Sequence, residues 1–100
     1  MVATLREKDI QNPVVAYARR AGCKASKYRS ENRRDAPDYI FFYNGRCLLI
    51  EFKAPGKKAR PTQLREIAKY RELGMHAYVV DDVAEGKMYI DLLTSDALYI

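Results

Sequence analysis

The segment Pro37–Lys53, PDYIFFYNGRCLLIEFK, sets the layout of the predicted sheet. Its aromatic and β-branched run, Tyr39–Tyr43, favours a strand. Asn44-Gly45 lies between two apolar runs and predicts a tight hairpin, because a type I′ turn needs positive φ at both central residues. The second run, Cys47–Phe52, is short and almost continuously apolar, which is typical of a central strand buried on both faces.

Three charged residues stand at the ends of these two strands. Glu51 and Lys53 are two apart, so on a strand their side chains point to the same face. The hairpin folds the start of the first strand back beside the end of the second, which brings Asp38 close to both. Two carboxylates and an ammonium there indicate a site for a hard divalent cation. The alternative is a structural ion pair, which is costly to bury without a ligand.

The pattern Pro37-Asp38, twelve residues, then Glu51-x-Lys53 resembles the motif of the PD-(D/E)xK nuclease superfamily. With the chain's size and flanking helices, it is most similar to the virus-type replication-repair nuclease (VRR-NUC) domain, over almost the whole chain. The resemblance implies one domain over residues 1–100. It also implies an α/β fold with a restriction-endonuclease-like core, a small mixed β-sheet flanked by helices in the order α-β-β-β-α-β.

Residues 4–21 have apolar side chains at helical spacing and predict a first helix. Pro13 should kink this helix or delay its start, because proline lacks a backbone donor. Thr4-x-x-Glu7 matches a capping box, in which Glu7 would bond back to the Thr4 amide. The family resemblance instead implies that Glu7 joins the metal site. Asp9 is the substitute acid if Glu7 only caps the helix.

Residues 61–73 predict a second long helix, and residues 76–81 predict a strand parallel to the central one. The inward stripe of this helix is expected to be Leu64, Ile67 and Ala68. Gln63 and Tyr70 are expected near the metal, and the resemblance implies that Gln63 helps to orient the site. The alternative for Gln63 is an ordinary exposed residue in the first turn of the helix. Residues 87–93 fit either a last strand or the edge of a helix.

Oxygen ligands in near-octahedral geometry suit Mg²⁺, and Mn²⁺ takes a similar set. We expect Asp38 and Glu51 to supply carboxylates and Phe52 to supply a main-chain carbonyl, with Glu7 as a further ligand, direct or through water. Lys53 would position the attacking water or offset the developing negative charge. The product would be a phosphodiester bond cut by in-line attack of water.

The chain carries 18 Lys and Arg against 13 Asp and Glu, a net charge of +5, which favours a polyanionic partner. Several of these cations flank the motif and are expected to bind DNA phosphates rather than only face solvent. They are Lys24, Lys27, Arg29, Arg33, Arg34, Lys57, Lys58 and Arg60.

Two widely separated cysteines, Cys23 and Cys47, lack metal-ligand spacing and are expected to be reduced thiols. No apolar run approaches the length of a membrane span, and no signal-peptide pattern is present. We therefore expect a cytoplasmic protein, bacterial or viral within a host cell, with no membrane partner and no organic cofactor. The small core and the apolar C-terminal residues 97–100 are consistent with a homodimer.

The sequence contains no recognition-helix or zinc-finger pattern that would read bases. Structure-selective cleavage is therefore expected, and stand-alone VRR-NUC-like domains resemble dimeric enzymes that act on branched DNA such as four-way (Holliday) junctions. The alternative is a non-catalytic basic module that recruits a partner to branched or single-stranded nucleic acid. An intact Asp38, Glu51 and Lys53 favours the nuclease.

Overall fold

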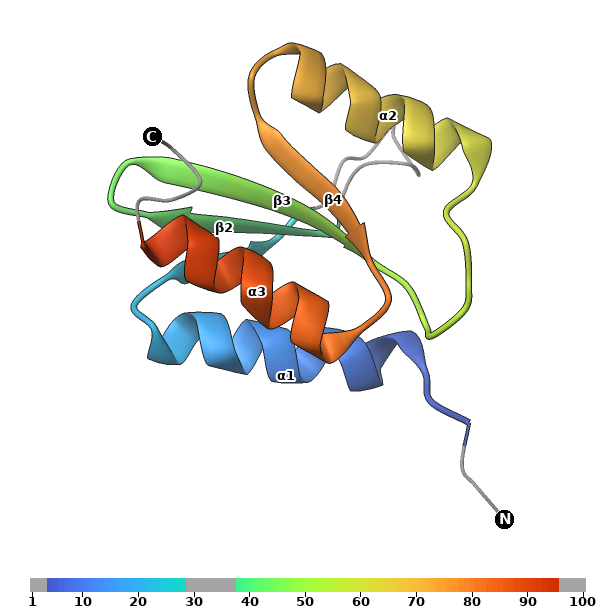
Figure 1. Ribbon diagram of the computed structural model, residues 1–100, viewed down its shortest axis with the longest axis horizontal. Helices are drawn as coiled ribbons and strands as arrows, with labels where there is room; N and C mark the ends of the chain where they lie inside the picture. Colours follow the sequence, from blue (N-terminus) through green and yellow to red (C-terminus); the bar gives the residue numbers. More distant parts are fainter. Residues whose placement is uncertain (1–3, 29–37, 96–100) are drawn as a thin grey trace.

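Three helices and four strands make up the fold. The computed structural model describes residues 4–28 and 38–95, and Figure 1 shows their arrangement. The elements in chain order are α1 (Glu7–Arg20), β1 (Lys24–Lys27), β2 (Tyr39–Tyr43), β3 (Arg46–Phe52), α2 (Pro61–Glu72), β4 (His76–Val80) and α3 (Val83–Thr94). Within this part of the chain no helix is long and apolar enough to cross a membrane.

The sheet is mixed, as predicted, with the strand order β1-β2-β3-β4. β1, β2 and β3 are antiparallel neighbours, and β4 runs parallel to β3. The hairpin between β2 and β3 turns through Asn44 at φ 47° and Gly45 at φ 77°, so both central residues have the positive φ that the Asn-Gly signal predicts. β3 is therefore an internal strand, and its last five residues are buried.

Helices cover both faces of the sheet (Figure 1). α1 and α3 pack against each other on one face, where Val14 and Ile90 meet Leu48 and Phe52 of β3 in a buried core. α2 covers the other face, where Ile67 packs against β3 and β4. Alternation along β3 therefore directs its even-numbered side chains to α1 and α3 and its odd-numbered side chains to α2.

α3 is a complete final helix, which the predicted element order lacks. Asp82 caps it by accepting a hydrogen bond from the Glu85 amide at 2.9 Å. Ile90 and Leu93, three residues apart, are fully buried on one face. The alternative of a last strand over residues 87–93 is therefore wrong, because this segment buries helical rather than alternate positions.

The start of α1 corrects the predicted cap. The helix begins at Glu7 after Arg6, whose backbone amide donates to the Asp9 carboxylate at 2.7 Å. The predicted Thr4–Glu7 capping box is wrong, and Asp9 is engaged in the helix start rather than serving as a substitute acid. α1 then continues as one helix through Pro13 to Arg20.

The inward face of α2 also differs from the prediction. Its buried residues are Gln63, Glu66 and Ile67, whereas Leu64 is 52% exposed. Ala68 is exposed as well, so of the predicted stripe only Ile67 is correct. Compared with the orientation predicted from its hydrophobic pattern, the helix is rotated about its own axis by one residue, or about 100°. Tyr70, which is expected near the metal, packs against the core cluster that contains Ile67.

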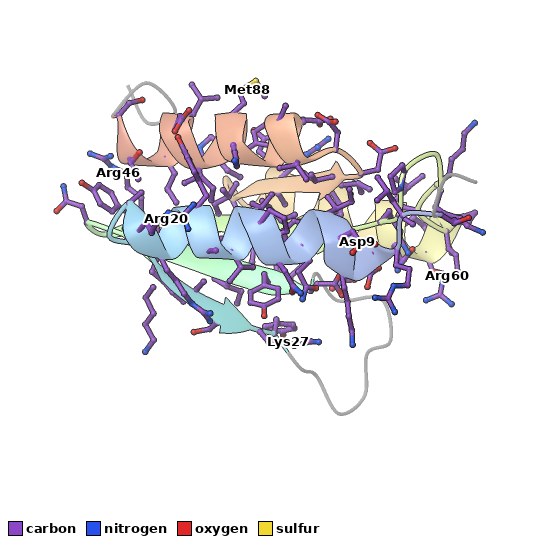
Figure 2. The ribbon with its side chains drawn as sticks, turned by 90° about the horizontal axis from the view of Figure 1, so that it is seen from below. Asp9, Arg20, Lys27, Arg46, Arg60 and Met88 are labelled. Atoms are coloured by element: carbon purple, nitrogen blue, oxygen red, sulfur yellow. The ribbon has the colours of Figure 1, made fainter. Side chains whose placement is uncertain are left out.

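Gly86 marks the closest approach of α3 to α1, and Gly86→Ala tests this packing. A Cβ at this position would lie 2.6 Å from Cγ2 of the fully buried Val14. We expect a net loss of about 1–2 kcal/mol in the free energy of unfolding, since overpacking exceeds the gain in helix propensity. Met88→Ala, at a 45% exposed position of the same helix, is the matched control for thermal melts (Figure 2). Equal melting temperatures for the two variants would contradict the packing argument.

Candidate active site at the end of β3

Asp38 is held at the end of β3 by main-chain contacts. The β2–β3 register pairs Tyr39 with Ile50, so Asp38 lies opposite Glu51. The Phe52 amide donates to Oδ2 of Asp38 at 2.9 Å. The Tyr28 amide donates to the Asp38 carbonyl at 2.8 Å. The predicted approach of Asp38 to the end of the next strand is therefore present, and backbone donors fix the orientation of its carboxylate.

Glu51 points to the face that α2 covers, and α2 supplies its partner. Nε2 of Gln63 donates to Oε1 of Glu51 at 2.7 Å. Oε1 of Gln63 accepts a hydrogen bond from the Arg60 amide at 2.8 Å, which holds the side chain in the first turn of the helix. Gln63 is 3% exposed and thus ties the start of α2 to the end of β3.

Lys53 completes this group on the same face. Its Nζ lies 3.6 Å from Oε1 of Glu51, and the two side chains are 18% and 5% exposed. The Lys53 amide donates to the Val80 carbonyl at 2.9 Å, so β4 holds the main chain at this point. The structure thus brings together Asp38, Glu51, Lys53 and Gln63 as the sequence predicts.

Burial and mutual repulsion disturb the carboxyl groups of this cluster. Removal from water, with the charges of Asp38 and Glu7 added, raises the pKa of Glu51 to about 7, although Lys53 opposes the shift. Burial also raises the pKa of Asp38, against the effects of the Phe52 amide, Lys53 and Lys27. Partial burial and then Asp38 raise the pKa of Glu7. These carboxylates therefore gain from a cation placed among them.

The donor atoms fit a small, hard divalent cation. Oε2 of Glu51 is buried and accepts no hydrogen bond from the described residues. The Phe52 amide points to Asp38, and in a strand the carbonyl of the same residue points the same way, so a main-chain oxygen joins the two carboxylates. Residues 4–28 and 38–95 hold no ready cluster of three or more His, Cys, Asp or Glu ligands. Two carboxylates and a carbonyl are thus available to a cation at this point, with the exposed Glu7 near Asp38 and Lys53.

The predicted DNA-binding cations divide into two groups and an undescribed remainder. Lys27 is paired with Tyr39 at the Asp38 end of β1, whereas Lys24 lies at the far end of that strand. Lys57, Lys58 and Arg60 are exposed between β3 and α2. Arg60 lies at the end of the molecule where α1 begins, opposite Arg20 (Figure 2). Three predicted residues lie outside the described residues: Arg29, Arg33 and Arg34.

Sequence reasoning did not single out Glu66 or the main-chain groups that position the site. Glu66 is 7% exposed on the buried face of α2, and its Oε2 lies 3.9 Å from Nζ of Lys69. Its spacing of three residues from Gln63 was the available signal, because such residues share a helix face. The amides of Tyr28 and Arg60 have no such signal, since any residue can supply them.

Comparison with known proteins agrees with this geometry. No family model matches the chain. "Putative nuclease p44" of Acyrthosiphon pisum secondary endosymbiont phage 1 is 40% identical over 78 residues, which span 77% of this chain and 84% of that protein. A solved structure described as a VRR_NUC domain matches with a TM-score of 0.78 and 27% identity, over 89% of this chain and 97% of its own.

The fold and the relatives define a nuclease with a restriction-endonuclease-like core. The chain belongs to the VRR-NUC family of the PD-(D/E)xK nuclease superfamily. The predicted fold class and family are therefore confirmed, with α3 as an addition to the predicted element order.

Gln63→Leu tests whether α2 positions Glu51. The change removes the 2.7 Å bond to Glu51 and should raise the metal concentration for half-maximal cleavage by about 10- to 100-fold, as loss of an outer partner of a metal ligand does. Metal titrations of DNA cleavage measure this, with the exposed Arg65→Leu on the same helix as the control. A lower melting temperature with an unchanged metal requirement would show that Gln63 only supports the fold.

Proposed function

We propose that this protein is a Mg²⁺- or Mn²⁺-dependent deoxyribonuclease that cuts branched DNA as a structure-selective endonuclease, in the manner of a Holliday-junction resolvase. The observation that carries the metal dependence is the buried Oε2 of Glu51, which has no hydrogen-bond donor among the described residues and lies beside a second carboxylate, Asp38. A buried carboxylate oxygen without a donor is costly unless a ligand satisfies it.

Four groups would hold the metal: the carboxylates of Asp38 and Glu51, the carbonyl of Phe52 and, at the rim, Glu7. When bound, the cation lowers the pKa of a coordinated water and stabilises negative charge on the scissile phosphate. The Phe52 amide fixes Asp38, and Gln63 fixes Glu51, so both carboxylates are oriented before the cation arrives.

The Lys53 ammonium supplies the positive charge of the site. Its Nζ lies 3.6 Å from Oε1 of Glu51, which directs its N–H donors toward the oxygens of the cluster. From there it would orient the attacking water or stabilise the charge that develops on the phosphate. The carboxylates would thus hold the cation, and the lysine would contact the reacting oxygens.

Branched DNA is the favoured substrate because the chain combines a net charge of +5 with no recognisable base-reading motif. Phosphate contacts position a protein on DNA without reading sequence, so geometry is left to select the substrate. A homodimer would offer two sites for paired nicks on a two-fold symmetric junction. Phe42, an apolar residue of β2 that is 42% exposed, supports such an interface, and sedimentation should give twice the chain mass.

Cleavage of labelled four-way-junction and linear duplex DNA, with Mg²⁺ or Mn²⁺ and with a chelator, tests the proposed function. Metal-dependent cutting of the junction, with little cutting of the duplex, is the expected result. Equal cutting of both substrates would retain the chemistry and reject structural selectivity. Binding to the junction with no cutting under either metal would favour the recruitment module.

Lys57→Ala tests the phosphate contacts near the site. Lys57 is exposed in the segment between β3 and α2. Loss of one phosphate contact should reduce the slope of log affinity against log salt by about 0.9. The matched control is Arg20→Ala, which also removes one positive charge. Arg20 is the last residue of α1 and lies at the end of the molecule away from Arg60 (Figure 2). An unchanged slope for Lys57→Ala in binding titrations would refute its phosphate role.

A further inference from the structure

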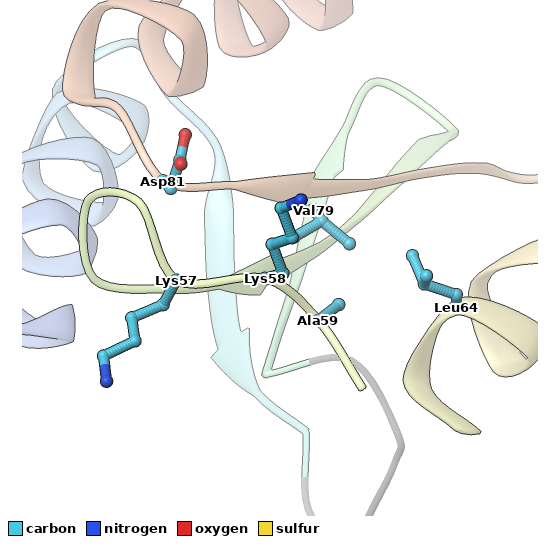
Figure 3. A pocket seen from close by; sticks show the side chains of 6 residues that line it. All are labelled: Lys57, Lys58, Ala59, Leu64, Val79 and Asp81. Carbon is cyan, nitrogen blue, oxygen red and sulfur yellow. The ribbon is translucent and has the colours of Figure 1, made fainter. Parts of the chain in front are cut away.

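A pocket of about 360 Å³ opens on the β4 side of the candidate active site. It is lined by Lys57, Lys58, Ala59, Leu64, Val79 and Asp81 (Figure 3). Val79 is the direct neighbour of Glu51 in the β3–β4 register, and Leu64 follows Gln63 in α2. Neighbouring strands are about 4.8 Å apart, so the pocket begins roughly one strand spacing from the metal-binding carboxylate, on the side away from Asp38.

Three of the six residues that line this pocket are apolar. They are Ala59 from the segment before α2, Leu64 from α2 and Val79 from β4. Leu64 is 52% exposed, so its side chain is available to a ligand. Paired DNA presents phosphates, sugars and base edges, and it keeps the apolar faces of its bases in the stack. An apolar pocket beside the scissile phosphate therefore suits a base that has left the stack.

The rim of the pocket carries groups that suit the rest of a nucleotide. Figure 3 shows the Lys58 side chain running toward Val79, with Leu64 facing the space from α2. Lys57 and Lys58 line the pocket, and their ammonium groups can bind the flanking phosphates. Asp81 adds a carboxylate, which accepts hydrogen bonds from exocyclic amino groups of bases.

The rim is held in place by a turn between β3 and α2. The Lys57 amide donates to the Ala54 carbonyl at 3.0 Å, and Gly56 has a φ of 79°, as a type II turn requires. The Gly56 amide donates to Oδ2 of Asp81 at 3.3 Å, which ties the turn to the end of β4. Lys57 and Lys58 therefore extend from a backbone that is anchored before DNA binds.

We propose that this pocket binds one unpaired nucleotide of the DNA, next to the phosphate that is cut. The proposal rests on the proposed nuclease function and names the feature of branched DNA that the site selects. Leu64 and Val79 contact the base, Lys57 and Lys58 contact the adjacent phosphates, and Asp81 accepts from the base edge. A duplex without an unpaired nucleotide leaves the pocket unfilled and binds through phosphates alone.

Fluorescence of 2-aminopurine at an unpaired position of a branched DNA tests the pocket without cleavage. Binding is measured in a chelator with wild type, Leu64→Ser and the control Leu73→Ser, which changes a 79% exposed leucine beyond the last residue of α2. We expect wild type and Leu73→Ser to shift the emission at saturation. Leu64→Ser should bind fully paired duplex as wild type does and lose affinity for the unpaired substrate by about 5- to 10-fold.

Each other outcome overturns the proposal. In one, Leu64→Ser shows the same emission shift and the same affinity for the unpaired substrate as wild type. In the other, wild type binds the DNA without any emission shift. Self-association that is lost in Leu64→Ser, with the emission shift retained, would assign the pocket to a second copy of the chain. Separate cleavage assays with Mn²⁺ show whether the proposed nuclease function holds, so failure of the pocket and failure of the nuclease are distinguishable.

Discussion

Glu51→Gln is expected to reduce DNA cleavage by at least ~10³-fold while DNA binding is nearly unchanged. The amide keeps the size of the side chain and can still accept the hydrogen bond from Gln63. It removes the negative charge that would bind the proposed metal and puts an amide NH2 group in place of the buried Oε2. Single-turnover cleavage at saturating Mn²⁺ measures the loss, and binding titrations of the same DNA measure affinity.

The matched control for this variant is Glu72→Gln, which removes the same charge from an exposed position at the end of α2. It should cut DNA as wild type does. Loss of both binding and cleavage in Glu51→Gln, with a lower melting temperature, would point to misfolding. Cleavage within 10-fold of wild type by folded Glu51→Gln would contradict the assignment of Glu51 as a ligand.

The second large effect is a loss of stability with rising pH in the metal-free protein. Burial and the neighbouring carboxylates raise the pKa of Glu51 from 4.5 to about 7 in the folded state. Between these values the folded state binds more protons than the unfolded chain, so the free energy of unfolding falls as pH rises. The fall should total about 3 kcal/mol across this window and level off above it.

Urea denaturation in a chelator at pH values from 4.5 to 8 measures this fall. Glu51→Gln cannot ionise and should show a flatter profile, with greater metal-free stability than wild type at pH 8. Mg²⁺ should stabilise wild type more at pH 8 than at pH 5, because protons compete with the cation for the carboxylates. Parallel pH profiles for wild type and Glu51→Gln would show that burial of Glu51 is not the cause.

The hairpin and the position of the site were predictable because their signals are local. The tight turn of this hairpin requires positive φ at both central residues. Asn44 and Gly45 adopt positive φ, and Asn-Gly is a strongly preferred pair for this turn. Once the hairpin is set, the pairing of Asp38 with the end of β3 follows from the register. The alternation of Glu51 and Lys53 then places both on one face. Short-range rules were sufficient to assemble this part of the site.

The orientation of α2 was not predictable from its hydrophobic pattern. Gln63 and Glu66 are polar and yet buried, whereas Leu64 is apolar and faces the pocket. A pattern analysis assigns polar side chains to solvent, and it fails where the buried face of a helix carries the site. The family resemblance placed Gln63 near the predicted metal site, and the structure adds its bond to Glu51.

Other features depend on tertiary packing or on main-chain groups. Oε2 of Glu51 is buried without a hydrogen-bond donor among residues 4–28 and 38–95, a product of tertiary packing that no sequence pattern encodes. α3 has a clear cap at Asp82, but Gly86 within it weakens the helical signal. That glycine is explained by the close approach of Val14, a contact between distant parts of the chain.

A direct titration of Mn²⁺ into wild type, Asp38→Asn and Glu51→Gln at pH 7.5, followed by calorimetry, tests whether the end of β3 is a metal site. Wild type should bind the ion saturably, and each variant should bind at least about 10-fold more weakly while it retains the wild-type fold by circular dichroism. Equal Mn²⁺ binding by wild type and both folded variants would contradict the assignment of Asp38 and Glu51 as the ligands.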